Sequence, residues 1–318
     1  MTSAELEAAW AGDEGAFASL MSPFLRELHV HCYRITGSVD DADDVLQEVL
    51  LAAWKGLRGF SGRSSLRTWL YRIATNCSLN LLRDRSRRAR PAPLPPFDPP
   101  TPSDLFDQPH FQPYPDAWVN ELDPAAQAIA RESVELAFVL ALQRMPPRQA
   151  AVLMLCDVLD FTVSEAAEML SIGKSAAKGL LQRARAGRPS SPPQATEAAQ
   201  WDIARRFAEA FSRDDIDALV GLLTDQCWLA MPPATERYVG RTAVEGFLRA
   251  SAAGRPGGSY ALSAARAGGR PAFVCYLDGR ARGLLIIEPT WDGSKIASIM
   301  RILDDGFHRH LGAPDLLE

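Results

Sequence analysis

The stretch "TVSEAAEMLSIGKSAAKGLLQRARA", residues 162–186, contains a short helical pattern, a turn and a longer basic helical pattern. Thr162 and Glu165 have the spacing of a capping box, which marks the N-terminus of a helix. Ser171 and Gly173 interrupt the first pattern, and the run after them carries lysine and arginine but no acid. This arrangement predicts a helix-turn-helix motif, and the positive charge of its second helix favours DNA as the ligand.

The second helix of this motif is predicted to enter a major groove by its N-terminal half. Side chains near its start would then face base edges, while the later basic side chains would meet phosphates. The candidate duplex-binding residues are Lys174, Ser175, Lys178, Gln182, Arg183 and Arg185. Many helical hairpins share this pattern, so an ordinary helical hairpin is the alternative.

A second basic segment, "LRTWLYRIATNCSLNLLRDRSRRAR", lies upstream at residues 66–90. Its spacing predicts one helix whose apolar stripe consists of Leu66, Leu70, Ile73, Cys77 and Leu81. A second face of this helix carries the polar residues Arg72, Asn76, Asn80 and Arg83. Asparagine offers a donor and an acceptor to a base edge and arginine binds phosphate, so this face is a candidate nucleic-acid surface.

The start of this helix adds two features that suit unpaired bases. Trp69 could stack on a base, and the preceding loop "RGFSGRSS", residues 58–65, could surround a base turned out of the duplex. Arg63 and Ser64 of this loop complete the candidate set, and Ser64 or Ser65 is expected to cap the helix. The alternative is a solvated polar face with Trp69 in the protein core.

An acidic helix is predicted directly before this loop, in "SVDDADDVLQEVLLAAWKGL", residues 38–57. Residues 38–50 hold five acids and no base, and either Ser38 or Asp40 can cap the helix. Its apolar stripe consists of Val45, Leu46, Val49, Ala53 and Trp54. Asp44, Gln47 and Glu48 cluster beside that stripe, which fits docking onto a basic partner helix. A solvated acidic face is the alternative.

The whole chain has 318 residues and a net charge of −5, yet its charges are separated into blocks. Residues 58–90 hold nine arginines against one acid, Asp84, so blocks of opposite sign indicate more than one partner surface. No run of eighteen apolar residues occurs, and the N-terminus lacks a signal-peptide pattern. Five dispersed cysteines without CxxC spacing indicate free thiols in a reducing cytoplasm, and we expect neither a metal site nor a cofactor.

The rest of the chain is divided by two proline-rich stretches. Residues 90–115 are expected to form an extended tether on the surface or against their neighbours, and residues 188–194 form a second break. After this break, a helical pattern gives way to strand-like runs that glycine- and proline-rich turns separate. This order predicts an α+β domain in which a curved antiparallel sheet wraps over helices.

Two of these segments resemble one known family. "DADDVLQEVLLAAWKGLRGFSGRSSLRTWLYRIATNCSLNLLR" is similar to region 2 of the extracytoplasmic-function (ECF) sigma factors of the sigma-70 family. "MPPRQAAVLMLCDVLDFTVSEAAEMLSIGKSAAKGLLQRARA" resembles their region 4. The two matches follow the family's order and are joined by the linker expected when region 3 is absent. One departure is "KSAAKGLLQR", where many relatives begin the recognition helix with a TVKSR-like run.

The resemblance implies a role for each surface. The acidic residues Asp44, Gln47 and Glu48 would dock on the clamp helices of the RNA polymerase β′ subunit. The loop at 58–65 and the polar face of the basic helix would melt the −10 element and capture it as a single strand. The last helix of region 4 would read the −35 element as duplex while the β-flap holds region 4. The linker would run through the polymerase toward the RNA exit path.

The C-terminal segment resembles the SnoaL-like (NTF2-like) domains that are fused to some ECF sigma factors. The similar runs are "FAEAFSRDDIDALVGLLTDQCWLAMPP", "YVGRTAVEGFL", "GRPAFVCYL" and "KIASIMRILD". Stand-alone relatives can be cyclases or isomerases, and the polar candidates for such a cone are Trp228, Asp304, His308 and His310. No acid–base pair has a spacing that demands catalysis, so we expect no enzyme and a regulatory domain. Binding or turnover of a small molecule is one alternative, and a DNA-binding repressor that acts without polymerase is another.

Together these observations predict a multidomain chain with two all-α domains followed by an α+β NTF2-like cone domain. The expected bounds are 1–92 for region 2, 93–127 for the linker, 128–188 for region 4, 189–199 for a second linker and 200–318 for the cone domain. The expected partners are core RNA polymerase and promoter DNA, without a membrane, in the cytoplasm. The cone domain is expected to contact region 2 or the linker, and a separate anti-sigma protein is left open.

Overall fold

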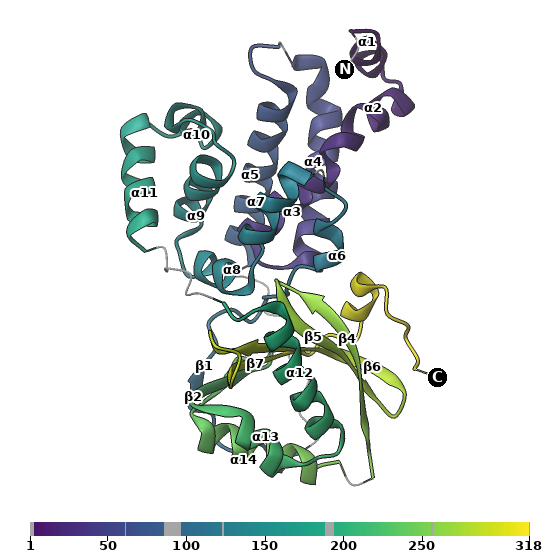
Figure 1. Ribbon diagram of the computed structural model, residues 1–318. Coiled ribbons are helices and arrows are strands. Elements are labelled where there is room, and N and C mark those ends of the chain that lie inside the picture. The colour runs from purple at the N-terminus through teal and green to yellow at the C-terminus, as the bar shows by residue number, and fades with distance from the viewer. Residues whose placement is uncertain are drawn as a thin grey trace. The chain divides into compact units, whose positions relative to one another are not determined.

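The computed structural model describes residues 3–60, 62–85, 97–122, 124–187, 194–255 and 257–317 (Figure 1). The chain divides into two compact units, which we call the helical unit (residues 1–89 and 118–189) and the sheet unit (residues 90–117 and 190–318). The division falls within the short helix α6 (Asp116–Val119). The expected linker at 93–127 is therefore shared between the two units.

The first part of the helical unit is built on three long helices that pack on one another, α3, α4 and α5. Its elements are α1 (Ser3–Ala11), α2 (Glu14–Met21), η1 (Ser22–Phe24), α3 (Leu25–Thr36), α4 (Val39–Gly56), η2 (Leu57–Gly59) and α5 (Leu66–Arg85). Ser38 caps α4 by accepting a hydrogen bond from the Asp41 amide. The Ser65 hydroxyl accepts one from the Thr68 amide at 3.0 Å where α5 begins. Both serines were among the predicted caps.

The buried faces of α4 and α5 agree with the sequence pattern to different degrees. On α4, Val45, Val49 and Ala53 are completely buried, as predicted, whereas Leu46 and Trp54 of the predicted stripe are only half-buried. On α5 the predicted stripe is partly wrong, because the buried residues are Leu66, Leu70, Tyr71, Ala74, Thr75 and Ser78, while Ile73, Cys77 and Leu81 are only half-buried. The hydroxyls of Thr75 and Ser78 donate to carbonyls one turn back, at 2.7 and 2.8 Å, so burial leaves neither unsatisfied.

The second part of the helical unit contains the helix-turn-helix motif. Its elements are α7 (Pro124–Ser133), α8 (Leu136–Gln143), α9 (Pro147–Leu153), the π-helical turn η3 (Met154–Val158), α10 (Val163–Met169) and α11 (Lys174–Ala186). The predicted capping box is present in both directions, since Thr162 accepts from the Glu165 amide and Glu165 accepts from the Thr162 amide. Ser171 lies in the turn at φ 52°, and α11 begins at Lys174. The predicted helix-turn-helix is therefore confirmed.

Among the described residues, the sheet unit combines helices with a seven-stranded sheet in the order β1-β3-β2-β7-β6-β5-β4. Its strands are β1 (Asp104–Leu105), β2 (Leu223–Ala230), β3 (Glu236–Val239), β4 (Tyr260–Ala267), β5 (Arg270–Leu277), β6 (Arg280–Pro289) and β7 (Ile296–Ile302). Its helices are α12 (Glu197–Ser212), α13 (Ile216–Leu222), α14 (Arg241–Ala253) and the short η4 (Phe307–Leu311). The sheet is mixed rather than purely antiparallel, because β2 and β7 pair in parallel.

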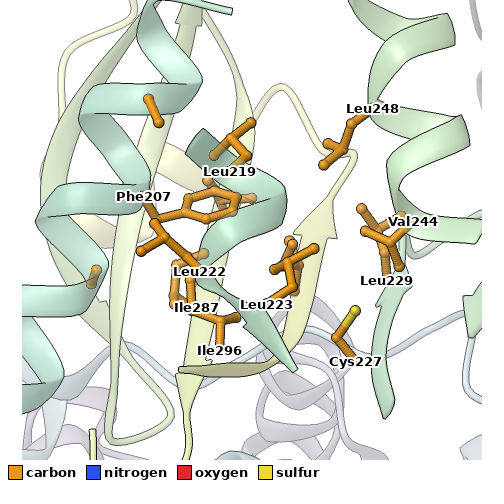
Figure 2. Close-up of a cluster of buried hydrophobic side chains, with 14 of the residues drawn as sticks. Phe207, Leu219, Leu222, Leu223, Cys227, Leu229, Val244, Leu248, Ile287 and Ile296 are labelled. Carbon is orange, nitrogen blue, oxygen red and sulfur yellow. The ribbon is translucent and has the colours of Figure 1, made fainter. Parts of the chain in front are cut away.

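The core of the sheet unit lies between these helices and one face of the sheet, where α12, α13 and α14 are placed (Figure 1). Figure 2 shows Phe207 of α12 and Leu219 of α13 pointing toward Leu223 and Ile287, while Val244 of α14 lies beside Leu229. These side chains are all at most 3% exposed. The interior expected for a cone-shaped domain is thus filled by apolar side chains. None of the helices within the described ranges combines the length and hydropathy that crossing a bilayer requires.

The proline-rich segment at residues 97–117 is an integral part of the sheet unit. Its strand β1 pairs antiparallel with β3 at the edge of the sheet, a position that tolerates nearby prolines. Phe106, Phe111 and Tyr114 are at most 2% exposed. Hydrophobic burial of these aromatic side chains explains why the segment lies against the sheet. The remainder of the predicted tether, residues 90–96, lies outside the described residues.

Candidate nucleic-acid and partner interfaces

The candidate duplex-binding face lies on α11. All six predicted residues are exposed: Lys174, Ser175, Lys178, Gln182, Arg183 and Arg185. The opposite face carries Ala177, Leu181 and Ala184, which are at most 5% exposed. Because α11 packs on α9 through this small apolar stripe, its basic face is turned to solvent.

Arg185 differs from the other five residues of this face. Its guanidinium binds the Asp157 carboxylate with two hydrogen bonds, from Nε at 3.0 Å and from Nη2 at 2.7 Å. This pairing with Asp157 raises the pKa of Arg185. A carboxylate that already occupies the Nε–Nη2 edge of the guanidinium reduces what Arg185 offers to a phosphate.

The candidate single-strand surface comprises the loop before α5 and one face of α5. Arg63 and Ser64 are exposed in the loop, and Arg72, Asn80 and Arg83 are exposed on the helix. Trp69 is half-buried, with its ring centroid 5.3 Å from that of Phe60. Residue 61 of the loop and residues 86–90 of the basic segment lie outside the described residues.

Asn76, at the centre of this face, is engaged by the helix-turn-helix. Its side-chain amide donates to the Arg72 carbonyl at 2.8 Å and to the Met169 carbonyl at 3.0 Å. Met169 is the last residue of α10, so the second bond joins the two parts of the helical unit. The polar face of α5 is therefore partly covered by the chain's own helix-turn-helix.

Other contacts join the same two parts of the helical unit. The Tyr71 ring meets the Phe161 ring edge-on at 5.6 Å between centroids. The Gln143 side chain donates to the Arg34 and Ile35 carbonyls at 3.3 and 3.1 Å, at the end of α3. These contacts, together with the Asn76 bond, hold the second part of the helical unit against α3 and α5.

His31 lies in the buried layer between α3 and α5. Its Nε2 is 2.8 Å from the Thr75 hydroxyl, which itself donates to the Tyr71 carbonyl. Because the single hydroxyl proton of Thr75 is used in that second bond, Nε2 of His31 carries the proton and donates. Burial, with smaller contributions from the charges of Arg34 and Arg67, lowers the pKa of His31 from 6.5 to about 3. The imidazole is therefore neutral at physiological pH.

The predicted partner-binding residues form a continuous exposed ridge on α4. Asp44, Gln47 and Glu48 are all exposed, and Leu51, one turn further along, is 59% exposed. We call these four residues the α4 ridge. The buried stripe of α4 lies on the other side of the helix, so the ridge combines two carboxylates with an apolar side chain facing solvent.

The polar candidates in the sheet unit are not gathered into one site. His308 is buried, and its Nε2 lies 2.7 Å from the Asp315 carboxylate. The Trp228 ring stacks on Phe106 at 6.3 Å between centroids, whereas Asp304 lines a cavity with other residues. Within the described ranges, no group of three or more histidine, cysteine or acidic side chains is arranged to hold a metal ion.

The contacts that hold the proline-rich segment to the sheet were missed in the sequence. The Arg237 guanidinium of β3 donates to the Asp104 carboxylate of β1, from Nε at 2.7 Å and from Nη2 at 2.5 Å. At the other end of the same segment, Asp116 accepts from Arg266 at 3.2 Å and from the Gly269 amide at 2.9 Å. The alternation of aromatic and acidic residues within the proline-rich segment was the signal that this segment binds a folded surface.

Comparison with known proteins covers both units of the chain. The matching family descriptions are Sigma-70 region 2, at residues 20–88, and Sigma-70, region 4, at residues 135–186. The ECF RNA polymerase sigma factor SigG of Mycobacterium tuberculosis is 39% identical over 319 residues, which span 95% of this chain and 85% of SigG. SigM of the same organism is 31% identical, over 58% of this chain and 82% of SigM.

Solved structures agree with this assignment at the level of the fold. The crystal structure of the Mycobacterium tuberculosis ECF sigma factor SigJ aligns with a TM-score of 0.59 and 23% identity, over 93% of this chain and 99% of SigJ. The C-terminal part combines helices with a sheet, as the predicted α+β NTF2-like domain does, although the sheet is mixed and not antiparallel as expected. Given the extent of the likeness to SigG and the order of the two matched regions, the chain belongs to the ECF RNA polymerase sigma factors.

Proposed function

We propose that this sigma factor docks on the clamp helices of the polymerase β′ subunit through the α4 ridge. One observation carries the proposal: Asp44, Gln47, Glu48 and Leu51 form an exposed ridge on a helix whose opposite side is completely buried. Carboxylates complement a basic partner helix, and an exposed leucine adds apolar area that docking would bury.

Charge reversal on the ridge tests this proposal. The double variant Asp44→Lys and Glu48→Lys should weaken binding of the full chain to core polymerase at least tenfold, because like charges would then face each other. Binding can be followed by fluorescence anisotropy of labelled sigma factor titrated with core enzyme. Glu209→Lys, an exposed residue of α12, is the matched control. Equal affinity of the double variant and the control would rule out the ridge as the docking surface.

Promoter recognition is proposed to use the two basic helices in different ways. The exposed face of α11 would read the −35 element as duplex, while the loop with Arg63 and Ser64 and the polar face of α5 would hold the −10 element as a single strand. Asn76 donates to the Met169 carbonyl in the free chain. Strand capture by the complete α5 face therefore requires that the helix-turn-helix separate from α5. Simultaneous docking of region 2 on the clamp and of region 4 on the β-flap would supply this separation.

The sheet unit is proposed to regulate the factor by holding its linker. Residues 103–106 are fixed by pairing of β1 with β3 and by the ion pair between Asp104 and Arg237. Tyr114, further along the segment, is completely buried. A linker that runs through the polymerase cannot keep these contacts, so they favour the free factor over the polymerase-bound factor.

Weakening this hold should raise activity. We expect Arg237→Ala to increase transcription from a cognate promoter at limiting core polymerase and to speed hydrogen exchange of residues 103–106. Arg249→Ala is the matched control, because it removes a similar exposed guanidinium that pairs with Asp217 and Glu245 and does not touch the linker. Unchanged transcription both for Arg237→Ala and for a chain lacking residues 195–318 would exclude regulation through the linker.

We also infer that the chain catalyses no reaction of its own. His308 is paired with Asp315, and Trp228 is packed against Phe106. The apolar cluster of Figure 2 fills the space between the helices and the sheet. The expected activity is therefore that of the assembled polymerase, and a purified chain should not convert cyclase or isomerase substrates.

A further inference from the structure

A cavity of about 690 Å³ lies at one end of the sheet in the sheet unit. It is bounded by the start of β4, the end of β5, the start of β6 and the end of β7. Residues 109–112 of the linker form another of its walls. Its volume is within the roughly 300–1,000 Å³ typical of small-molecule sites. The cavity borders the apolar cluster between the helices and the sheet, because Tyr260 packs against that cluster and also lines the cavity.

Arg301 of β7 is the polar group of the cavity that would bind the charged end of a ligand. Its guanidinium carbon lies 4.8 Å from the centroid of the Tyr260 ring, and its Nη2 donates to the Arg282 carbonyl at a long 3.4 Å. The Nε of Arg301 is buried without a hydrogen-bond partner. Among the described residues, no carboxylate lies within ion-pair distance of Arg301. A buried N–H without a partner costs free energy, and a carboxylate can accept two parallel hydrogen bonds from one edge of a guanidinium.

The charges around the cavity define the kind of anion that fits. Arg282 is paired with Asp305 at 2.8 Å, so its charge is already balanced. Asp304 accepts from the Gln112 side chain at 3.0 Å and from the Gly306 amide at 2.8 Å. The two arginines and two aspartates in the lining carry no net charge before a ligand binds. A single negative charge on Arg301 is favourable there, whereas a dianion would also be repelled by the two carboxylates.

The apolar side chains of the cavity lining favour an anion that also has an apolar body. Phe111 of the linker, Leu277 of β5 and Ile302 of β7 contribute hydrocarbon surface, and Tyr260 contributes an aromatic face. A ligand with one carboxylate and an aromatic or aliphatic body would place its charge on Arg301 and its body against these side chains.

We propose that this cavity binds a small organic monocarboxylate, with Arg301 holding the carboxylate and the linker wall covering its apolar body. A ligand that touches both the linker and the sheet binds only while the two are together, so it stabilises the held linker. This second step rests on the proposed function, in which release of the linker accompanies polymerase binding. Gln112, which is 3% exposed and bonded to Asp304, already joins the two walls.

Calorimetric titration of the full chain with 2-naphthoate tests the site. We expect saturable binding at millimolar concentration or below, and binding at least tenfold weaker for 2-naphthamide, which is nearly the same shape without the charge. Arg301→Gln should weaken naphthoate binding at least tenfold, whereas Arg206→Gln, an exposed arginine of α12, should leave it unchanged. Absence of saturable binding of benzoate, 2-naphthoate and octanoate alike would overturn the proposal.

A second variant keeps the test valid if Arg301→Gln does not fold. Leu277→Trp fills part of the cavity and retains Arg301, so it should reduce naphthoate binding without a change in circular dichroism. Full binding by a folded Leu277→Trp chain would place the ligand elsewhere and overturn the proposed site.

Coupling to the linker has its own readout. In the wild-type chain, naphthoate should slow hydrogen exchange of residues 104–112 and lower transcription at limiting core polymerase. Naphthoate that binds but changes neither quantity would overturn the coupling alone. Arg237→Ala tests the regulatory function separately from ligand binding, because Arg237 holds the linker but does not line the cavity. If transcription is unchanged both in this variant and in the chain lacking residues 195–318, the regulatory function fails, whatever the result of the naphthoate titration.

Discussion

The two basic helices, α11 and α5, present their polar faces to solvent in different ways. On α11 all six candidate residues are exposed, and Arg185 is the one among them that is paired with a carboxylate, Asp157 of η3. On α5 the central Asn76 is bonded to Met169, and Trp69 packs against Phe60. The polar face of α11 is therefore accessible in the free chain, whereas the polar face of α5 is partly engaged in contacts that hold the helical unit together.

This difference indicates an order of events. Reading a duplex with α11 requires no rearrangement of the helical unit. Capturing a single strand with α5 requires first that the contacts to Met169 and Phe161 be broken. Each contact is weak by itself, since a net hydrogen bond contributes about 1 kcal/mol and an aromatic pair a similar amount. The docking of both regions on polymerase therefore has enough free energy to separate them.

The largest effect is expected from removing the charge of α11. A variant with Lys174→Ala, Lys178→Ala and Arg183→Ala should weaken binding of the holoenzyme to a promoter on the order of 100-fold, through lost base and phosphate contacts. The three residues are exposed, so the melting temperature should not change. Filter binding measures the affinity, and Arg206→Ala serves as the control. A promoter affinity equal to that of the control would mean that α11 does not meet DNA.

The second largest effect is expected from acidification, which should destabilise the buried layer between α3 and α5. The pKa of His31 is lowered from 6.5 to about 3 in the folded chain. Between these two pH values, His31 is protonated in the unfolded chain and neutral in the folded chain. Stability from this group is complete above pH 6.5 and is lost as the pH falls toward 3, with a loss of about 2 kcal/mol at pH 5. Hydrogen exchange of α5 amides at pH 5 and 7.5, corrected for intrinsic rates, measures this loss.

Substitution of His31 separates this effect from general acid destabilisation. His31→Gln keeps a side-chain N–H for Thr75 but has no group that titrates in this range. We expect the pH dependence of α5 protection to be much smaller in His31→Gln than in the wild-type chain. The same steep loss in both chains would show that another group, and not His31, controls the acid response.

Two asparagines on the same face of α5 allow a direct comparison, in which the expected effect is smaller. Asn76→Ala removes the bond to the Met169 carbonyl and should weaken the contact between α5 and the helix-turn-helix by about 1 kcal/mol. Asn80 is exposed, so Asn80→Ala should leave that contact unchanged. Faster exchange of the amides at residues 169–171 in Asn76→Ala only is the expected result. Equal exchange in both variants would mean that the Asn76 bond does not hold the two parts together.

Local chemistry explains which features could be predicted from the sequence. The Thr162–Glu165 capping box and the Ser38 cap depend on residues three positions apart, and both were correctly predicted. The exposed face of α11 follows from the helical period alone. Thr75 and Ser78 were missed as buried residues, because their hydroxyls satisfy themselves within the helix. The strand β4, with its run of alanines, owes its conformation to pairing with β5 along its whole length, which no local pattern indicates.

The contacts that regulate the candidate surfaces are long-range and could not be predicted. Asn76 and Met169 are 93 residues apart, and Asp104 and Arg237 are 133 residues apart. Each pair joins elements whose individual patterns were identified, but nothing in the pattern of one element specifies the partner. The charge blocks of the sequence indicate that more than one partner surface exists, whereas only the packed structure determines which of them the chain itself covers.

The smallest effect is expected where two neighbouring arginines of α11 differ only in their pairing. Arg183 and Arg185 are both exposed, but Arg185 is bound to Asp157 through two hydrogen bonds. If both met phosphates equally, each alanine substitution would make the salt dependence of promoter binding shallower by about one unit of slope. Because Asp157 competes for the Arg185 guanidinium, Arg185→Ala should change this slope less than Arg183→Ala does. Asp157→Ala should remove this difference by freeing Arg185 for the phosphate backbone of the DNA, so promoter binding would strengthen slightly and its salt dependence would become steeper. Equal slopes for Arg183→Ala and Arg185→Ala would mean that the ion pair opens on DNA, and that both arginines then contribute alike.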